Sequence, residues 1–191
     1  PGGDPGDNAP ELVMLYLEDL SKLMARYHPL AKIWLSMQGF EKPQVDYVHN
    51  WINEKMPDWL GGLVAGPSSP PIPSTRARLP QRYGLRDYPD ITHTVRCQFP
   101  VAWWDPAFHL TLGRESANPR PVFYKAVQDF FGHYTSGFIS YSDGVHDDVN
   151  KAVWSRLGWQ PDATPREILL DYTRCFFGSV VAESAADGIL A

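Results

Sequence analysis

Apolar residues recur at helical spacing near the start of the chain. The repeat consists of Val13, Tyr16, Leu17, Leu20, Leu23, Met24 and Tyr27. Steps of three and four residues place side chains on one face of a helix, so this pattern predicts a helix over 9–27. Asn8 and Glu11 have the spacing of a capping box, which predicts that Asn8 caps this helix.

Four short apolar runs have the length of buried strands. They lie at 31–38, 59–66, 91–98 and 137–143. Runs of this length without strict alternation are typical of parallel strands that are covered on both faces. The run at 91–98 is rich in β-branched residues, which favour strands.

Helical patterns separate and follow these runs. They are expected near 43–56, 75–79, 120–133, 147–157, 165–177 and 179–191. The segment 67–90 contains six prolines and predicts a long ordered loop in which only 75–79 is helical. Thr164 and Glu167 form a second capping-box pattern, with Pro165 at the first helical position.

Strands that alternate with helices predict parallel pairing, because a parallel connection needs a crossover helix. Four such strands form either an open sheet or half of a barrel, and a complete (β/α)8 barrel needs roughly 250 residues. We therefore expect α/β architecture, with the C-terminal half of a TIM barrel over 1–160 and a short helical extension over 161–191. The opening Pro-Gly-Gly-Asp-Pro-Gly without an initiator Met predicts that the missing N-terminal half of the barrel lies upstream in a larger protein.

Composition narrows the classes of partner. The 191 residues are 43% hydrophobic and 13% aromatic, with a net charge of −5 and no block of Lys or Arg. This argues for a packed core and against nucleic acid as a partner. No apolar run approaches the roughly 20 residues of a membrane span, so we expect no membrane partner. Cys97 and Cys175 have no partner spacing and are expected to be reduced and buried, and no feature indicates a compartment.

Ligands of parallel α/β proteins bind beyond the carboxyl ends of the strands. The residues that follow the expected strands are Asp4, Gln38, Ser68, Ser69, Gln98, Trp103, Trp104, Asp105, Tyr141, Ser142 and Asp143. Carboxylates and amides pair with hydroxyl groups, and aromatic faces stack on the C–H face of a pyranose. This mixture indicates a carbohydrate ligand.

Cleavage of a glycosidic bond needs a protonated carboxyl and a second group that acts as base or nucleophile. The candidates are Asp4, Asp105, Glu115, Asp143, Asp147 and Asp148. Glu115 is equally explained by a salt bridge with Arg114 or Arg120, and Asp4 by an ordinary turn. For Asp147 and Asp148 the favoured interpretation is that they stabilise the N-terminus of the following helix.

The six histidines have no spacing that is typical of metal ligands. We expect no metal site and no cofactor. His93 lies between two threonines in the third expected strand, where it is either a core histidine with satisfied hydrogen bonds or a polar group that points into the barrel.

Three passages carry a resemblance to a known class of enzyme. They are Pro-Gly-Gly-Asp-Pro-Gly at 1–6, Tyr-Pro-Asp-Ile-Thr-His-Thr-Val-Arg-Cys-Gln at 88–98 and Tyr-Ser-Asp-Gly-Val-His-Asp-Asp-Val-Asn-Lys at 141–151. In these the chain resembles TIM-barrel glycoside hydrolases of the broad α-glucuronidase and β-hexosaminidase type, including bacterial relatives. The resemblance implies a catalytic carboxylate at the end of the fourth strand, which maps onto Asp4, with Glu115 and Asp143 as further catalytic candidates.

Two functions from different classes are therefore open. The first is a glycoside hydrolase with carboxylate acid/base catalysis by Asp4, Glu115 or Asp143. In it, the sugar is held by Gln38, His93, Gln98, Trp103, Trp104 and Tyr141. The second is a non-catalytic barrel that binds glycan or has a structural role. An open-sheet hydrolase is disfavoured, because the sequence has no GxSxG motif and no glycine-rich nucleotide loop.

Overall fold

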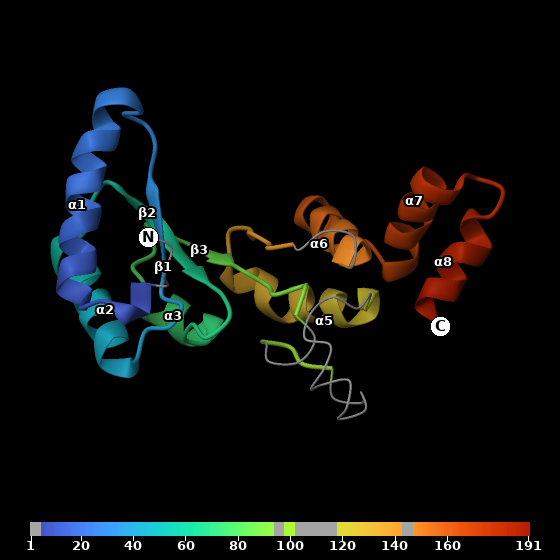
Figure 1. Cartoon of the computed structure of the whole chain (residues 1–191), viewed down its shortest axis with the longest axis horizontal. Helices are drawn as coiled ribbons and strands as arrows, with labels where there is room; N and C mark the ends of the chain where they lie inside the picture. The colour runs from blue at the N-terminus through green and yellow to red at the C-terminus, as the bar shows by residue number, and fades with distance from the viewer. Residues whose placement is uncertain (1–4, 94–97, 102–117, 143–146) are drawn as a thin grey trace. The chain divides into compact units, whose positions relative to one another are not determined.

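The computed structural model describes residues 5–93, 98–101, 118–142 and 147–191 (Figure 1). The chain divides into two compact units. The first unit comprises Pro1–Tyr88 with Tyr134–Ile139, and the second unit comprises Pro89–His133 with Ser140–Ala191. The helices and the parallel sheet together place the chain in the α/β class that the sequence predicts.

Helices and strands alternate in the first unit. In chain order they are η1 Pro5–Asp7, α1 Pro10–Tyr27, β1 Ile33–Ser36, α2 Lys42–Lys55, β2 Leu60–Ala65, α3 Ile72–Arg78 and β3 Gly84–Asp87. The strands form a parallel sheet in the order β1-β2-β3. The predicted helices at 9–27 and 43–56 and the predicted strands at 31–38 and 59–66 are thus confirmed.

The two faces of this sheet differ. Leu35, Leu63 and Leu85 are paired across the three strands and are fully buried. Leu35 lines a hollow together with Leu17 and other residues of α1, so this face is the one that the helix covers. Figure 1 shows α1 and α2 beside the sheet. The leucine face therefore holds the core of the first unit.

The opposite face carries a tryptophan that lies across glycines. A Cβ atom at Gly62 or Gly84 would stand 2.7 Å and 2.5 Å from ring atoms of Trp34. The guanidinium carbon of Arg86 lies 3.8 Å from the centre of the Trp34 ring, in cation–π geometry. Trp34 is half-buried, and its ring spans two neighbouring strands because those strands have no side chains at these positions.

The second unit is helical in its described part. Its helices are α5 Pro121–Phe131, α6 Asp148–Trp159, α7 Pro165–Phe177 and α8 Ala182–Leu190, and the short η2 spans Gly132–Tyr134 at the boundary. Tyr124 of α5 packs on Trp154 of α6 with ring centres 5.9 Å apart, and Trp154 is fully buried. Arg166 of α7 pairs with Glu183 and Asp187 of α8. The helices predicted at 120–133, 147–157, 165–177 and 179–191 are confirmed with small shifts of their ends.

The third strand differs from the prediction. It is β3 at Gly84–Asp87, inside the segment that the prolines marked as a loop. Residues 91–93 and 98 of the expected strand are not in a strand, and 94–97 lie outside the described residues. The physical reason is the carboxylate of Asp90, which accepts the backbone N–H groups of Thr92 and His93 and bends the chain.

The fourth predicted strand, at 137–143, is reduced to isolated bridges in its described part. Asp87 pairs with Phe138, and Asp90 pairs with Tyr141, both in parallel orientation. Pro89 lies between the two paired aspartates in the sequence and has no N–H, and the N–H of Tyr88 donates to the carbonyl of Ala65 instead. The described sheet therefore has three strands, where the sequence predicted four.

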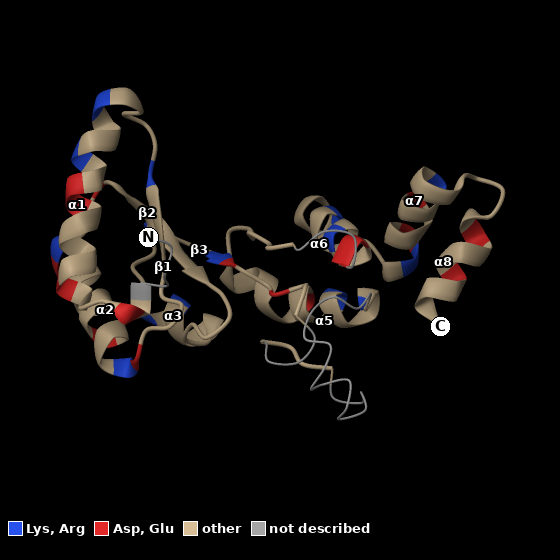
Figure 2. Ribbon diagram, in the orientation of Figure 1, with Lys and Arg blue, Asp and Glu red and all other residues tan. Residues whose placement is uncertain are grey.

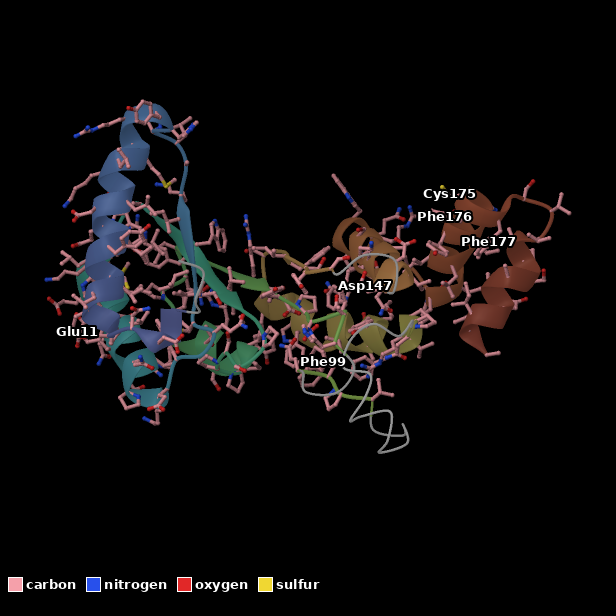
Figure 3. The ribbon with its side chains drawn as sticks, viewed as in Figure 1. Glu11, Phe99, Asp147, Cys175, Phe176 and Phe177 are labelled. Atoms are coloured by element: carbon pink, nitrogen blue, oxygen red, sulfur yellow. The ribbon has the colours of Figure 1, made fainter. Side chains whose placement is uncertain are left out.

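The two predicted capping boxes have different outcomes. At α7 the box is confirmed, with Glu167 N–H donating to Thr164 Oγ1 over 3.3 Å and Thr164 N–H donating to the Glu167 carboxylate over 2.8 Å. At α1 the prediction is wrong, because Ala9 occupies the N-cap and makes no side-chain bond. The expected burial of Cys175 is also wrong, since this thiol is free and exposed on α7 (Figure 3).

Thr164→Ala removes the side-chain half of the α7 capping box. We expect the free energy of unfolding to fall by about 1 kcal/mol, because the N–H of Glu167 loses its acceptor. Urea denaturation followed by circular dichroism measures the change. Ser184→Ala is the control, since the Ser184 hydroxyl is exposed and donates to the Val181 carbonyl. Equal effects of both substitutions would contradict the capping role.

Candidate functional site

The second unit contains a cluster of polar side chains around a buried carboxylate. We define the Asp90 cluster as Asp90, Thr92, His93, Tyr141, Ser142 and Asp147. The Asp90 side chain is 6% exposed. Its Oδ1 atom accepts the backbone N–H groups of Thr92 over 3.2 Å and of His93 over 3.0 Å. Asp90 thus fixes the turn from which the neighbouring side chains project.

His93 is held by the same carboxylate. Its Nδ1 atom lies 3.0 Å from Oδ1 and 2.9 Å from Oδ2 of Asp90. The imidazole stacks on the Tyr141 ring, with centres 6.2 Å apart and planes inclined by 15°. The side chain of His93 is 34% exposed and Tyr141 is 39% exposed, so both rings reach the surface of this unit.

A second carboxylate closes the other side of the cluster. Asp147, labelled in Figure 3, is 2% exposed. It accepts hydrogen bonds from the hydroxyls of Thr92 and Ser142, the latter over 2.8 Å. Lys151 Nζ lies 3.7 Å from Asp147 Oδ1. Asp147 stands at the N-cap of α6 as expected, but its side chain bonds to the cluster rather than to helix N–H groups.

Asn150 of α6 ties the cluster to the segment before α5. Its amide nitrogen donates to the carbonyls of Ile91 over 3.3 Å and Asn118 over 3.0 Å, and its Oδ1 accepts from the N–H of Arg120 over 2.9 Å. The side chain is 2% exposed. Three backbone groups therefore depend on one buried amide.

Asn150→Ala is expected to lower the free energy of unfolding by about 2 kcal/mol, because it leaves a buried N–H and two carbonyls without their partner. Asn53→Ala is the matched control, since Asn53 is exposed and its amide donates to the carbonyls of His49 and Arg78. Urea denaturation of both variants provides the test. If the free energy of unfolding falls no more for Asn150→Ala than for Asn53→Ala, burial of the Asn150 amide does not increase its contribution to stability.

Three of the predicted site residues meet in this cluster or beside it. His93 and Tyr141 belong to it, and Gln98 accepts the backbone N–H of Asp90 over 3.3 Å through its Oε1. Asp4, Trp103, Trp104, Glu115 and Asp143 lie outside the described residues, as does Asp105. The expectation that His93 lies within a strand is wrong. Its Nδ1 bonds to Asp90, and its side chain is 34% exposed.

Gln38 lies in the first unit, after β1, where its backbone N–H donates to Ser36 Oγ over 3.2 Å. Ser69 follows β2 in the same unit, and its hydroxyl accepts the N–H of Gly66 over 3.1 Å. At the end of β3 stands Asp87, which the sequence analysis did not single out. Its carboxyl is 3% exposed, and burial raises its pKa to about 7.

Sequence reasoning missed Asp90 and Thr92 as site residues. The pattern Asp90-Ile91-Thr92 is an available signal, because an Asp whose carboxylate accepts the N–H two residues on is a common turn. The apolar Ile91 and β-branched Thr92 favoured a strand instead. Asp147 was interpreted as a helix-capping residue, and its hydrogen bonds with Thr92 and Ser142 were therefore not predicted.

Charge and metal chemistry add little to this picture. Lys and Arg residues occur together with Asp and Glu along several helices, as the ribbon in Figure 2 shows for α1 and α6. Within the described ranges, no three His, Cys, Asp or Glu side chains are grouped to hold a metal ion. The described helices include none that is both long and apolar enough to cross a bilayer.

A scan against family models, a search of curated proteins and a search of solved structures found no match.

Proposed function

We propose that this chain is a carbohydrate-active domain, a glycoside hydrolase built on the C-terminal half of a (β/α)8 barrel. The observation that carries the proposal is the pair of surface rings in the Asp90 cluster. The exposed Tyr141 ring lies beside an imidazole that a buried carboxylate orients. An aromatic face with fixed polar groups at its side suits the apolar face and the hydroxyl groups of a pyranose.

Features of the first unit support the barrel. Its sheet is parallel, and its strands are joined by helices. The face opposite the leucines carries Trp34 across glycines, and side chains from the strands fill the interior of a barrel. β1 is an edge strand of the described sheet, and α1 exposes Leu12, Tyr16, Leu23 and Tyr27. Further strands and helices from an upstream half are the partner that would cover this edge.

Sugar binding tests the proposal through Tyr141. We expect that Tyr141→Ala weakens binding of the best sugar roughly 2- to 13-fold, because loss of a stacked aromatic ring removes about 0.5–1.5 kcal/mol of contact. Tyr16→Ala is the control, since Tyr16 is exposed on α1 of the first unit. Calorimetric titration with neutral and acidic monosaccharides and short oligosaccharides measures both. Binding that is unaltered by Tyr141→Ala, or absent for every sugar, contradicts the proposal.

A non-catalytic glycan-binding or structural domain is the alternative, and one observation favours it. The two described carboxylates of the cluster, Asp90 and Asp147, are buried and already accept several hydrogen bonds. A glycosidase of this type needs a carboxyl that reaches the substrate, and we propose Asp4, Glu115 or Asp143 for that role. Release of nitrophenol from aryl glycosides by the wild-type chain distinguishes the enzyme from the binding domain.

A further inference from the structure

The hydrogen bonds of Asp90 determine which nitrogen of His93 is free. Oδ1 of Asp90 accepts two backbone N–H groups, and both carboxylate oxygens lie within 3.0 Å of His93 Nδ1. An ionised carboxylate only accepts hydrogen bonds, so Nδ1 must carry the hydrogen of this contact. The lone pair, or the second proton when the ring is charged, is therefore at Nε2.

The position of the ring leaves Nε2 available. Within the described part of the chain, Nε2 of His93 makes no hydrogen bond, and the side chain is one-third exposed. The stacked Tyr141 ring and the bond to Asp90 keep the imidazole in one orientation. His49 is the contrast in this chain, because it is 2% exposed and both of its ring nitrogens are enclosed.

We propose that His93 is the catalytic acid and base of the site and that Asp90 is its positioning residue. This inference rests on the proposed glycoside hydrolase. An oriented His next to a carboxylate is a common proton-transfer arrangement in enzymes, and here it places one exchangeable proton beside the ring on which the sugar would stack. Neither Asp90 nor Asp147 can take this part, because hydrogen bonds from the protein occupy their oxygens.

The proton balance of the reaction is simple. Charged His93 donates its Nε2 proton to the glycosidic oxygen as the bond from that oxygen to C1 breaks. The positive charge that develops at C1 is stabilised by the carboxylate that the proposed glycoside hydrolase requires in any case. Nε2 then takes a proton from the water whose oxygen bonds to C1. One water is consumed, one glycosidic bond is cleaved, and the imidazole returns to its starting state.

The tautomer of His93 is a direct test that does not need a substrate. In nitrogen-15 spectra of the whole chain, neutral His93 is expected with hydrogen at Nδ1 and a bare Nε2. Asp90→Asn is expected to shift this preference, because an amide can offer a hydrogen to Nδ1 as well as accept one. Exposed His28, outside the cluster, is the internal control. A His93 with hydrogen at Nε2 in the wild type would overturn the proposed dyad.

Kinetics of His93→Gln test the catalytic role. Glutamine keeps a donor for Asp90 but cannot transfer protons, so kcat for a nitrophenyl glycoside is expected to fall about 10²–10⁴-fold, with KM changed less than threefold. For the dinitrophenyl glycoside, whose leaving group needs no proton, the loss of kcat in the bond-breaking step should be at least tenfold smaller. His28→Gln is the control and should retain wild-type rates.

The outcomes separate this proposal from the proposed function. If the wild type hydrolyses aryl glycosides and His93→Gln does so within threefold of the same rate, only the role of His93 is overturned. Equal losses with both leaving groups also overturn it, because they indicate a structural effect of the substitution. If the wild type hydrolyses no glycoside of the panel, which includes glucuronides and N-acetylhexosaminides, the hydrolase and the dyad fall together.

Discussion

Asp87→Asn is expected to make the chain more stable than the wild type above pH 7 and to abolish a loss of stability that the wild type shows between pH 4 and 7. The cause is the burial of the Asp87 carboxyl at the end of β3. Oδ1 of this side chain is buried without a hydrogen-bond partner. Burial raises its pKa to about 7, and the nearby backbone N–H of Tyr88, which donates to the Ala65 carbonyl, opposes this only in part.

The direction follows from the protons bound in each state. In the unfolded chain the Asp87 carboxyl ionises at its ordinary pKa of 3.8, whereas the folded chain keeps the proton until about pH 7. As pH rises between these values, the unfolded state loses its proton first and becomes favoured. The wild type therefore loses about 4 kcal/mol over this range, at 1.36 kcal/mol for each pKa unit. Asparagine does not ionise and removes this loss.

Urea denaturation at pH 4, 6 and 8 measures the effect as a free energy of unfolding. Asp58→Asn is the matched control, because Asp58 is exposed and its pKa is lowered by its bond to Arg82. It should show no gain that grows with pH. A constant difference between Asp87→Asn and the wild type at all three pH values would mean that folding does not raise the pKa of the Asp87 carboxyl.

His49→Leu is expected to stabilise the chain at acidic pH. The His49 imidazole is buried on α2, and neither ring nitrogen has a hydrogen-bond partner. Burial lowers its pKa from 6.5 to about 4, and the nearby charge of Arg78 adds to this while Asp46 opposes it. Between pH 6.5 and 4 the unfolded state binds a proton that the folded state does not, so the wild type loses about 3 kcal/mol as the pH falls.

Leucine has no proton to gain and places no polar atom in this core. The free energy of unfolding of His49→Leu, measured by urea denaturation, should therefore exceed that of the wild type by more at pH 4.5 than at pH 8. His28→Leu is the control at an exposed position. A gain at pH 8 that is as large as the gain at pH 4.5 would show that packing, and not protonation, is the source of the effect.

The sequence predicted those elements whose signal lies within the element itself. The helices α1 and α2 repeat apolar residues at three and four positions, and β2 is a run of small and apolar residues that glycine and proline delimit. These signals need no knowledge of tertiary contacts. The capping box at Thr164 is also local, and it formed as predicted.

The third strand could not be found in this way. β3 has four residues, and two of them are Arg86 and Asp87. Pairing of all four residues with β2 and the stacking of Arg86 on Trp34 make this segment a strand. Segment 91–98 has the better strand composition, but the Asp90 carboxylate takes the N–H groups at its start. The composition of a segment does not show whether a side chain will accept the backbone hydrogen bonds that a strand needs.

The sequence predicted some residues of the site, but it did not predict the hydrogen bonds that hold the site together. Position after an expected strand selected Gln98 and Tyr141, and both lie at or beside the cluster. The residues that hold the cluster together, Asp90 and Asn150, bond to groups as far as 59 positions away in the sequence. Such long-range contacts depend on the tertiary fold, and the local periodicity of apolar residues carries no information about it.

The contact of Trp34 with Gly62 and Gly84 couples the substitutions that these three positions can accept in evolution. Any side chain at Gly62 or Gly84 would collide with the ring of Trp34, and at Gly62 also with the carbonyl of Gly84. A related sequence with a smaller residue at position 34 can therefore carry alanine at position 84, provided that the Ser136 hydroxyl, which would lie 2.9 Å from the new Cβ, also shifts. Among relatives of this chain, these two positions should vary together, while position 62 should remain glycine even where the tryptophan has been lost.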